Sequence, residues 1–152
     1  MKRKIILSAV MIAVLAAGIF AIITIKNNSS NRTESFDTME DALKTASFNM
    51  DYPDRLGGYP ATVFASDSST VEVQYGNGGF IRKTLGVNDN SGGSTKYGEV
   101  NEENINGLTV TLKGDDGLIY LAAWNDNNFA YTVKVNKGIS VDEMTEYIEA
   151  TR

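Results

Sequence analysis

The chain has 152 residues, of which 42% are hydrophobic and 22% are charged, and it carries 14 basic and 19 acidic side chains. This length fits one domain of average size and excludes two large enzymatic domains. Because the sequence contains neither cysteine nor histidine, it excludes disulfides, thiolate nucleophiles, zinc–thiolate sites and any mechanism that needs a histidine as general base.

An uncharged, apolar segment follows the first four residues. Cations occupy positions 2–4, and residues 5–25 contain no charge. At 1.5 Å per residue, about 21 helical residues match the roughly 30 Å hydrocarbon core of a bilayer, which predicts a transmembrane helix. A cleaved signal peptide is the alternative, because Val14 and Ala16 have the small-residue spacing that a peptidase needs. Cleavage there would leave residues 17–25 as an apolar terminus, so we favour an uncleaved single-pass signal anchor.

The charges on either side of this segment predict its orientation. Only Lys26 and Arg32 follow it closely, so the positive-inside rule places residues 1–4 in the cytoplasm and everything after Lys26 outside the membrane. We expect the membrane to be that of a bacterial cell, with the main domain in the cell envelope. After Lys26 the chain carries ten basic and 19 acidic residues, a net charge of −9. Such an acidic part offers no clustered basic surface, so we expect no nucleic-acid partner.

The first residues outside the membrane are small and polar. Residues 26–35 show no apolar periodicity and predict a flexible stalk, which leaves residues 36–152 for the extracytoplasmic domain. A first helix is predicted over about residues 38–47, with Asp37 as N-cap and Glu40 as its capping-box partner. Its apolar face would consist of Met39, Ala42, Leu43 and Ala46.

From residue 60 onward, apolar residues alternate with a period of two, which predicts antiparallel strands joined by turns. The clearest segments are residues 62–65, 71–75, 80–85, 108–113, 118–124 and 129–135, with a weaker one at 98–103. Turns rich in Gly, Asp and Asn are expected at residues 76–79, 114–117 and 125–128, and a mobile polar loop at 86–95.

A second helix is predicted at the end of the chain. Ser140 would be its N-cap and Glu143 its capping-box partner. The residues expected along its buried stripe are Met144, Tyr147, Ile148 and Thr151. The whole pattern predicts an α+β fold, in which a helix at each end flanks an antiparallel sheet of six or seven strands.

Two parts of the chain resemble a known domain. The first runs from Phe48 through Pro53 and Leu56 to Tyr59, a turn into a first strand. The second has Lys113-Gly114 at a strand end, a strand closing on Trp124, an aromatic strand with Phe129 and Tyr131, and Ile139–Glu143 opening a helix. This order of motifs resembles a domain of unknown function at the extracytoplasmic end of single-pass bacterial envelope proteins, some of them anti-sigma-factor-associated or lipoprotein-like. The resemblance covers nearly all of residues 36–152. It implies a fold similar to lipoprotein carriers, in which a curved antiparallel sheet wraps helices and can hold an acyl chain.

Aromatic side chains are the best candidates for ligand binding. Trp124, with Tyr120 and Tyr131 nearby in the predicted sheet, could line a groove, and Tyr59 lies in a Gly- and Pro-rich turn that could form a binding lip. The alternative for each is an ordinary role in the core or in a turn.

No catalytic or metal-binding motif is present. The sequence has no Ser-x-x-Lys or Gly-x-Ser-x-Gly pattern to nominate a nucleophile. The oxygen-rich stretches at residues 88–90, 115–116 and 126–128 lack the spacing of a twelve-residue calcium loop. We therefore expect no cofactor, no metal and no enzymatic activity.

These observations favour a non-enzymatic, membrane-anchored binding domain outside the bacterial membrane. Its ligand would be a lipid or another apolar molecule, or a protein partner. The alternative is a sensory or regulatory module that signals through a second protein in the membrane, since four cytoplasmic residues cannot signal alone.

Overall fold

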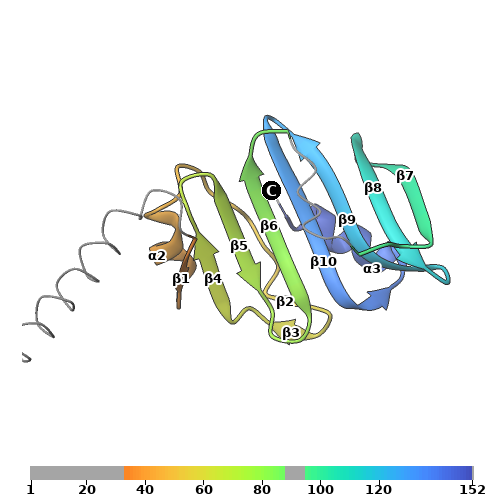
Figure 1. Ribbon diagram of the computed structural model, residues 1–152, viewed down its shortest axis with the longest axis horizontal. Coiled ribbons are helices and arrows are strands. Elements are labelled where there is room, and N and C mark those ends of the chain that lie inside the picture. Colours follow the sequence, from red (N-terminus) through yellow and green to blue (C-terminus); the bar gives the residue numbers. More distant parts are fainter. Residues whose placement is uncertain (1–32, 88–94, 152) are drawn as a thin grey trace, which may run out of the picture. The chain divides into compact units, whose positions relative to one another are not determined.

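An eight-stranded antiparallel sheet forms the body of the described chain (Figure 1). The computed structural model describes residues 33–87 and 95–151, and the sheet order is β1-β4-β5-β6-β10-β9-β8-β7. The strands are β1 (Glu34–Phe36), β4 (Val63–Ser66), β5 (Thr70–Gln74), β6 (Gly79–Leu85), β7 (Glu99–Ile105), β8 (Leu108–Asp115), β9 (Leu118–Asp126) and β10 (Phe129–Ile139). A separate two-stranded hairpin consists of β2 (Arg55–Leu56) and β3 (Tyr59–Pro60).

Several predictions concern residues that the structure does not describe. The predicted cytoplasmic tip, the anchor at residues 5–25 and most of the stalk lie outside the described residues, as does most of the predicted mobile loop. Within the described part of the chain, no helix is both long and apolar enough to cross a membrane.

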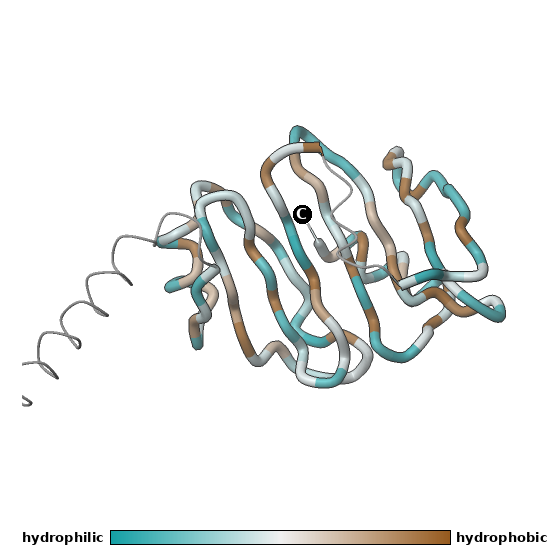
Figure 2. The backbone as a smooth tube through the Cα atoms, in the orientation of Figure 1, coloured by the Kyte–Doolittle hydropathy of each residue, from teal (hydrophilic) through white to brown (hydrophobic). Residues whose placement is uncertain are grey.

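Two helices lie against one face of the sheet. The short helix α2 (Met39–Leu43) contacts β1 and β4, and α3 (Val141–Glu149) contacts β9 and β10. Hydrophobic and hydrophilic residues alternate along the central strands (Figure 2), so these strands direct apolar side chains to the helix-covered face. The fully buried side chains include Val71, Val73, Ile81, Val110, Leu112, Val133, Val135, Met144 and Ile148. Burying each of them contributes roughly 1.5–3 kcal/mol.

The α+β prediction is confirmed, with the six clear strand segments in β4, β5, β6, β8, β9 and β10 and the weaker one in β7. The turns are tighter than predicted. Asp116-Gly117 and Asn127-Asn128 alone connect their strands, and all four residues have positive φ. Two such residues in succession are typical of a type I′ turn, whose twist matches that of the flanking strands. Strands β8 and β9 therefore extend into the segments expected to be turns.

Three strands were not predicted. The hairpin β2–β3 falls in the segment interpreted as a turn, and β1 includes two residues of the predicted stalk, Glu34 and Ser35. Strand β1 is fixed by pairing with β4, where Glu34 lies opposite Ser66 and Phe36 opposite Phe64. The described sheet thus has eight strands, rather than six or seven.

The start and the length predicted for the first helix are wrong. Thr38, not Asp37, is the N-cap of α2, and its side chain accepts the backbone N–H of Asp41, not of Glu40. The helix ends at Leu43, and the carbonyl of Ala42 near its end accepts hydrogen bonds from the N–H groups of residues 45 and 46 and from the hydroxyl of Ser66. This last bond, 2.7 Å long, attaches the helix to β4. The predicted apolar face is confirmed, since Ala42 is buried and the other three residues pack against the core.

The second helix matches its prediction closely. Ser140 caps α3 by accepting the N–H of Glu143, and Met144, Ile148 and Thr151 are buried along one stripe. Two details differ. Tyr147, the fourth residue of the predicted stripe, is only half-buried. The carboxylate of Glu143, predicted to complete the capping box, accepts the O–H of Tyr147.

Candidate functional site

A fork opens where β8 and β9 stop pairing. Their ladder begins at Val110 opposite Trp124, whereas β7–β8 pairing continues to Leu108 and β9–β10 pairing continues to Asp126. The two hairpins therefore separate at this end of the sheet, in the region where the arrowhead of β9 lies near the start of β8 in Figure 1.

A hollow of about 620 Å³ occupies this fork. Its lining residues come from both hairpins and from both faces of the sheet: Glu102, Gly107, Leu108, Thr109, Thr111, Ala123, Trp124, Asn125, Asp126, Asn127 and Tyr131. The volume lies within the range of roughly 300–1,000 Å³ that is typical of small-molecule sites.

Two of the predicted ligand-binding residues form the aromatic wall of the hollow. The rings of Trp124 and Tyr131 lie opposite each other on β9 and β10, with centroids 5.1 Å apart and planes within 2° of parallel. Each side chain is only 4% exposed. The pair therefore offers an edge to the hollow, while most of its surface supports the core.

A buried lysine lies directly behind this pair. Lys83 on β6 is opposite Tyr131 and only 7% exposed. Its Nζ donates a hydrogen bond of 2.7 Å to the carbonyl of Asn49. The ring centroids of Phe129, Tyr131 and Phe48 lie 4.6, 5.2 and 5.7 Å from Nζ, close enough for cation–π attraction.

Two opposing effects of its surroundings act on the pKa of Lys83. Burial lowers the pKa of the ammonium, while the carboxylates of Asp51 and Asp126 oppose this by their charge. Asp126 also lines the fork hollow. A ligand there would therefore lie close to a carboxylate whose charge raises the pKa of Lys83. The sequence contained a signal for this residue, because Lys83 is in phase with the buried Ile81 on the same strand.

The structure places the other two predicted residues elsewhere. Tyr59, 45% exposed, lines a different hollow at the opposite end of β10. Tyr120 lies at an irregularity of β9, where it has no partner in either ladder, and its ring is 6.4 Å from that of Tyr97. The four aromatic residues thus do not form one groove, and only Trp124 and Tyr131 are brought together.

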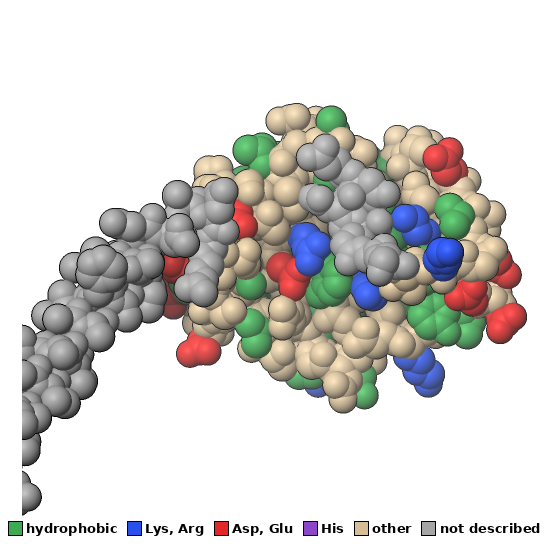
Figure 3. All heavy atoms as spheres, in the orientation of Figure 1, with side chains coloured by type: hydrophobic (Ala, Val, Ile, Leu, Met, Phe, Trp, Pro, Cys, Tyr) green, Lys and Arg blue, Asp and Glu red, His purple; other side chains and the backbone are tan. Residues whose placement is uncertain are grey.

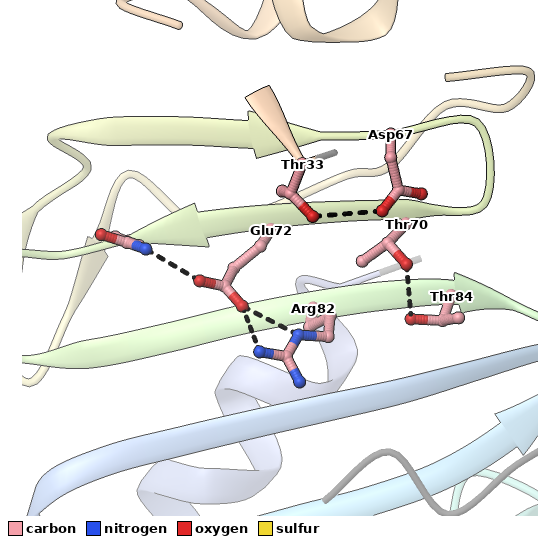
Figure 4. A network of polar contacts seen from close by, with 7 residues as sticks. Thr33, Asp67, Thr70, Glu72, Arg82 and Thr84 are labelled. Atoms are coloured by element: carbon pink, nitrogen blue, oxygen red, sulfur yellow. Dashed lines mark hydrogen bonds and ion pairs between the residues drawn. The ribbon is translucent and has the colours of Figure 1, made fainter. Parts of the chain in front are cut away.

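No described helix covers the opposite face of the sheet, which is largely polar in its N-terminal half. Figure 4 shows Glu72 on β5 accepting two hydrogen bonds from Arg82 on β6, and Thr70 beside Thr84. Figure 3 shows several basic side chains near the middle of this face and acidic ones mainly towards its margins. Phe80 contributes an aromatic ring here, with the Arg82 guanidinium 4.7 Å from its centroid.

The described residues contain no group of three or more Asp or Glu side chains that could hold a metal ion. Comparison with known proteins found no matching family model, no matching curated protein and no matching solved structure. The resemblance to an envelope domain therefore stays a prediction.

Proposed function

We propose that this chain is a non-enzymatic binding domain that a transmembrane anchor at residues 5–25 holds on the outer side of a bacterial membrane. The observation that carries the proposal is the fork hollow between β8 and β9, which combines the volume of a small-molecule site with the exposed edge of a stacked aromatic pair. The absence of cysteine and histidine from the sequence supports a binding role over a catalytic one.

The lining of the hollow favours an amphiphilic ligand. Leu108, Ala123 and the edge of Trp124 supply apolar contacts, and Thr109 and Asn125 supply hydrogen-bonding groups. A lipid, or another molecule with one apolar and one polar part, has this chemistry.

The fork is a better entrance for such a ligand than the seam between helix and sheet. In α3, the side chains that face the sheet, Met144 and Ile148, are at most 2% exposed and belong to the same core cluster as Val110 on β8. A ligand in the seam would have to displace them, whereas the fork is already open.

Native mass spectrometry with lipid extraction tests this proposal. The full chain is purified from bacterial membranes, and the masses that remain bound are compared between the wild type and Thr109→Trp, in which a large ring on an exposed position would fill the hollow. A matched control is Ser68→Trp, which places the same ring in the distant β4–β5 turn.

We expect a stoichiometric small molecule on the wild type and on the Ser68→Trp control, and its loss from Thr109→Trp. A chain that is folded and carries no small molecule, or one whose ligand persists in Thr109→Trp, would refute the fork as the binding site. In the first case, cross-linking would then identify a protein partner.

A further inference from the structure

A second hollow, of about 460 Å³, lies at the other end of β10 from the fork. Four segments meet there: the β2–β3 turn, the β5–β6 turn, the end of β10 and the first turn of α3. Figure 1 shows the β2–β3 hairpin beside the lower ends of β5 and β6. The fork hollow shares no lining residue with this one.

Hydrogen bonds fix the walls of this hollow to one another. The N–H of Gly57 donates to the hydroxyl of Tyr147 on α3 at 3.1 Å, and this hydroxyl donates to Glu143 Oε1 at 3.1 Å. On the other side, Asn136 donates its backbone N–H to Gly78 O and its side-chain N–H to Asn77 O, both at 3.0 Å. The hollow is therefore held in shape before any ligand arrives, which reduces the entropic cost of binding.

Glycine forms part of the wall because there is no room for a side chain. A Cβ on Gly78 would lie 2.3 Å from the carbonyl oxygen of Leu56, and one on Gly138 would lie 2.8 Å from the ring of Tyr120. At these positions the backbone packs directly against neighbouring segments, so the wall carries no side chain of its own there.

Tyr59 provides an aromatic surface at the rim. Its ring is 45% exposed and lies over the β5–β6 turn, with its Cδ1 3.8 Å from the position of a Cβ on Gly76. The hairpin that carries it is anchored by Leu56, which is fully buried. An exposed ring on a fixed backbone can stack on the apolar face of a ligand without losing much side-chain entropy.

Charged and amide groups complete the lining. Lys137 and Glu143 both line the hollow, and their charged groups are too far apart to form an ion pair. Among residues 33–87 and 95–151, nothing bonds the ammonium of Lys137 or the Oδ1 of Asn136. The hollow thus presents an aromatic face together with a cation, a carboxylate and an amide oxygen that can still accept and donate hydrogen bonds.

We propose that this hollow is a carbohydrate-binding site. A pyranose ring has an apolar C–H face and a rim of hydroxyl groups, each of which donates and accepts hydrogen bonds. The C–H face would stack on Tyr59, and the hydroxyl rim would bond to Glu143, Asn136 and Lys137. This inference is independent of the fork hollow and of its ligand.

Amide NMR spectra of the full chain test the proposal. The ¹⁵N-labelled protein, in micelles of a detergent without a sugar headgroup, is titrated with chitotetraose and separately with maltotetraose. We expect at least one of them to shift the amide signals of Gly57, Gly78 and Asn136, with a Kd of about 1 mM or below.

Substitutions then assign the binding to the hollow. Tyr59→Ala is expected to raise the Kd at least about tenfold, which corresponds to about 1.4 kcal/mol, whereas Tyr59→Phe retains binding. Leu85→Ala is the matched control, since Leu85 is equally exposed (45%) and lies at the far end of the sheet. Glu143→Gln is a second test that keeps the size of the side chain, with the exposed Glu146→Gln as its control.

Three results would overturn the proposal. The first is no shift with either sugar up to about 10 mM, ten times the weakest Kd expected. The second is a set of shifts confined to residues away from the hollow. The third is unchanged binding in Glu143→Gln together with unchanged binding in a folded Tyr59→Ala protein.

Discussion

Tyr75→Phe tests how the core of this domain is stabilised. The Tyr75 side chain is fully buried, and its hydroxyl donates a hydrogen bond of 2.8 Å to the carbonyl of Pro53. Phenylalanine keeps the ring but removes this bond. A neutral hydrogen bond contributes about 0.5–1.5 kcal/mol, and a carbonyl left without a donor adds to the loss. We therefore expect the substitution to lower the free energy of unfolding by about 1–2 kcal/mol at pH 7.

The same substitution should have the opposite effect at high pH. Burial, aided by the charge of Asp54, raises the pKa of Tyr75 well above its usual range. Above about pH 10 the unfolded chain releases this proton while the folded protein keeps it. The free energy of unfolding of the wild type therefore falls by about 1.4 kcal/mol per pH unit, and Tyr75→Phe, which has no such proton, does not show this fall. Below about pH 9 the wild type should have its full excess in free energy of unfolding over Tyr75→Phe. The two proteins should be equally stable near pH 11, and above that pH the variant should be the more stable one.

Urea denaturation of residues 33–152 between pH 7 and pH 11.5 measures both effects. Fluorescence of Trp124, the only tryptophan, follows unfolding. Tyr59→Phe is the control, because that side chain is 45% exposed and its curve should coincide with the wild type. Contributions from other ionisable groups cancel in the difference between the wild type and the variant. Parallel curves for the wild type and Tyr75→Phe across this range would refute the reasoning.

Three further predictions concern α3 and the buried lysine. Met144→Ala removes a fully buried side chain and should lower the free energy of unfolding by about 2–5 kcal/mol, whereas Met39→Ala, at a half-buried position, should cost clearly less. Ser140→Ala removes the N-cap of α3 and should cost about 1 kcal/mol in the same urea assay; a change below about 0.3 kcal/mol would contradict the capping role. Burial lowers the pKa of Lys83, so the unfolded chain holds more protons than the folded protein as the pH rises towards about 10.4. The stability of the wild type relative to Lys83→Met should therefore increase over this range, and a constant difference would contradict the burial effect.

Local patterns predicted the elements that are long enough to show a period. The alternation in residues 80–85 and 129–135 was sufficient to predict β6 and β10, and Ser140 identified the start of α3. Strands β1 and β2 have three and two residues, too few for any alternation, and their conformation depends on pairing with a partner strand. The N-cap of α2 was misplaced by one residue because Asp37 and Thr38 are both good caps, and the sequence does not reveal which of them has the required backbone conformation.

The candidate site was predictable only in part. The proximity of Trp124 and Tyr131 followed from their positions in consecutive strands, and the structure confirms it. The fork could not be predicted, because it depends on where the β8–β9 ladder ends rather than on any residue type. Lys83 was missed because a charged side chain is ordinarily assigned to solvent, although its phase with Ile81 placed it on the buried face.

The pairing of β6 with β10 has a consequence for how the chain folds. These strands pair at seven positions, from Leu85 opposite Phe129 to Gly79 opposite Val135, although residues 86–128 separate them along the chain. Every other strand pair except β1–β4 joins consecutive strands. Hairpins of this kind close quickly, whereas the β6–β10 junction must first overcome the entropy of closing a long loop. We therefore expect two meanders, β4–β6 and β7–β10, to form early and their junction to set the folding rate, so that substitutions along β6 and β10 slow folding more than those in the outer hairpins.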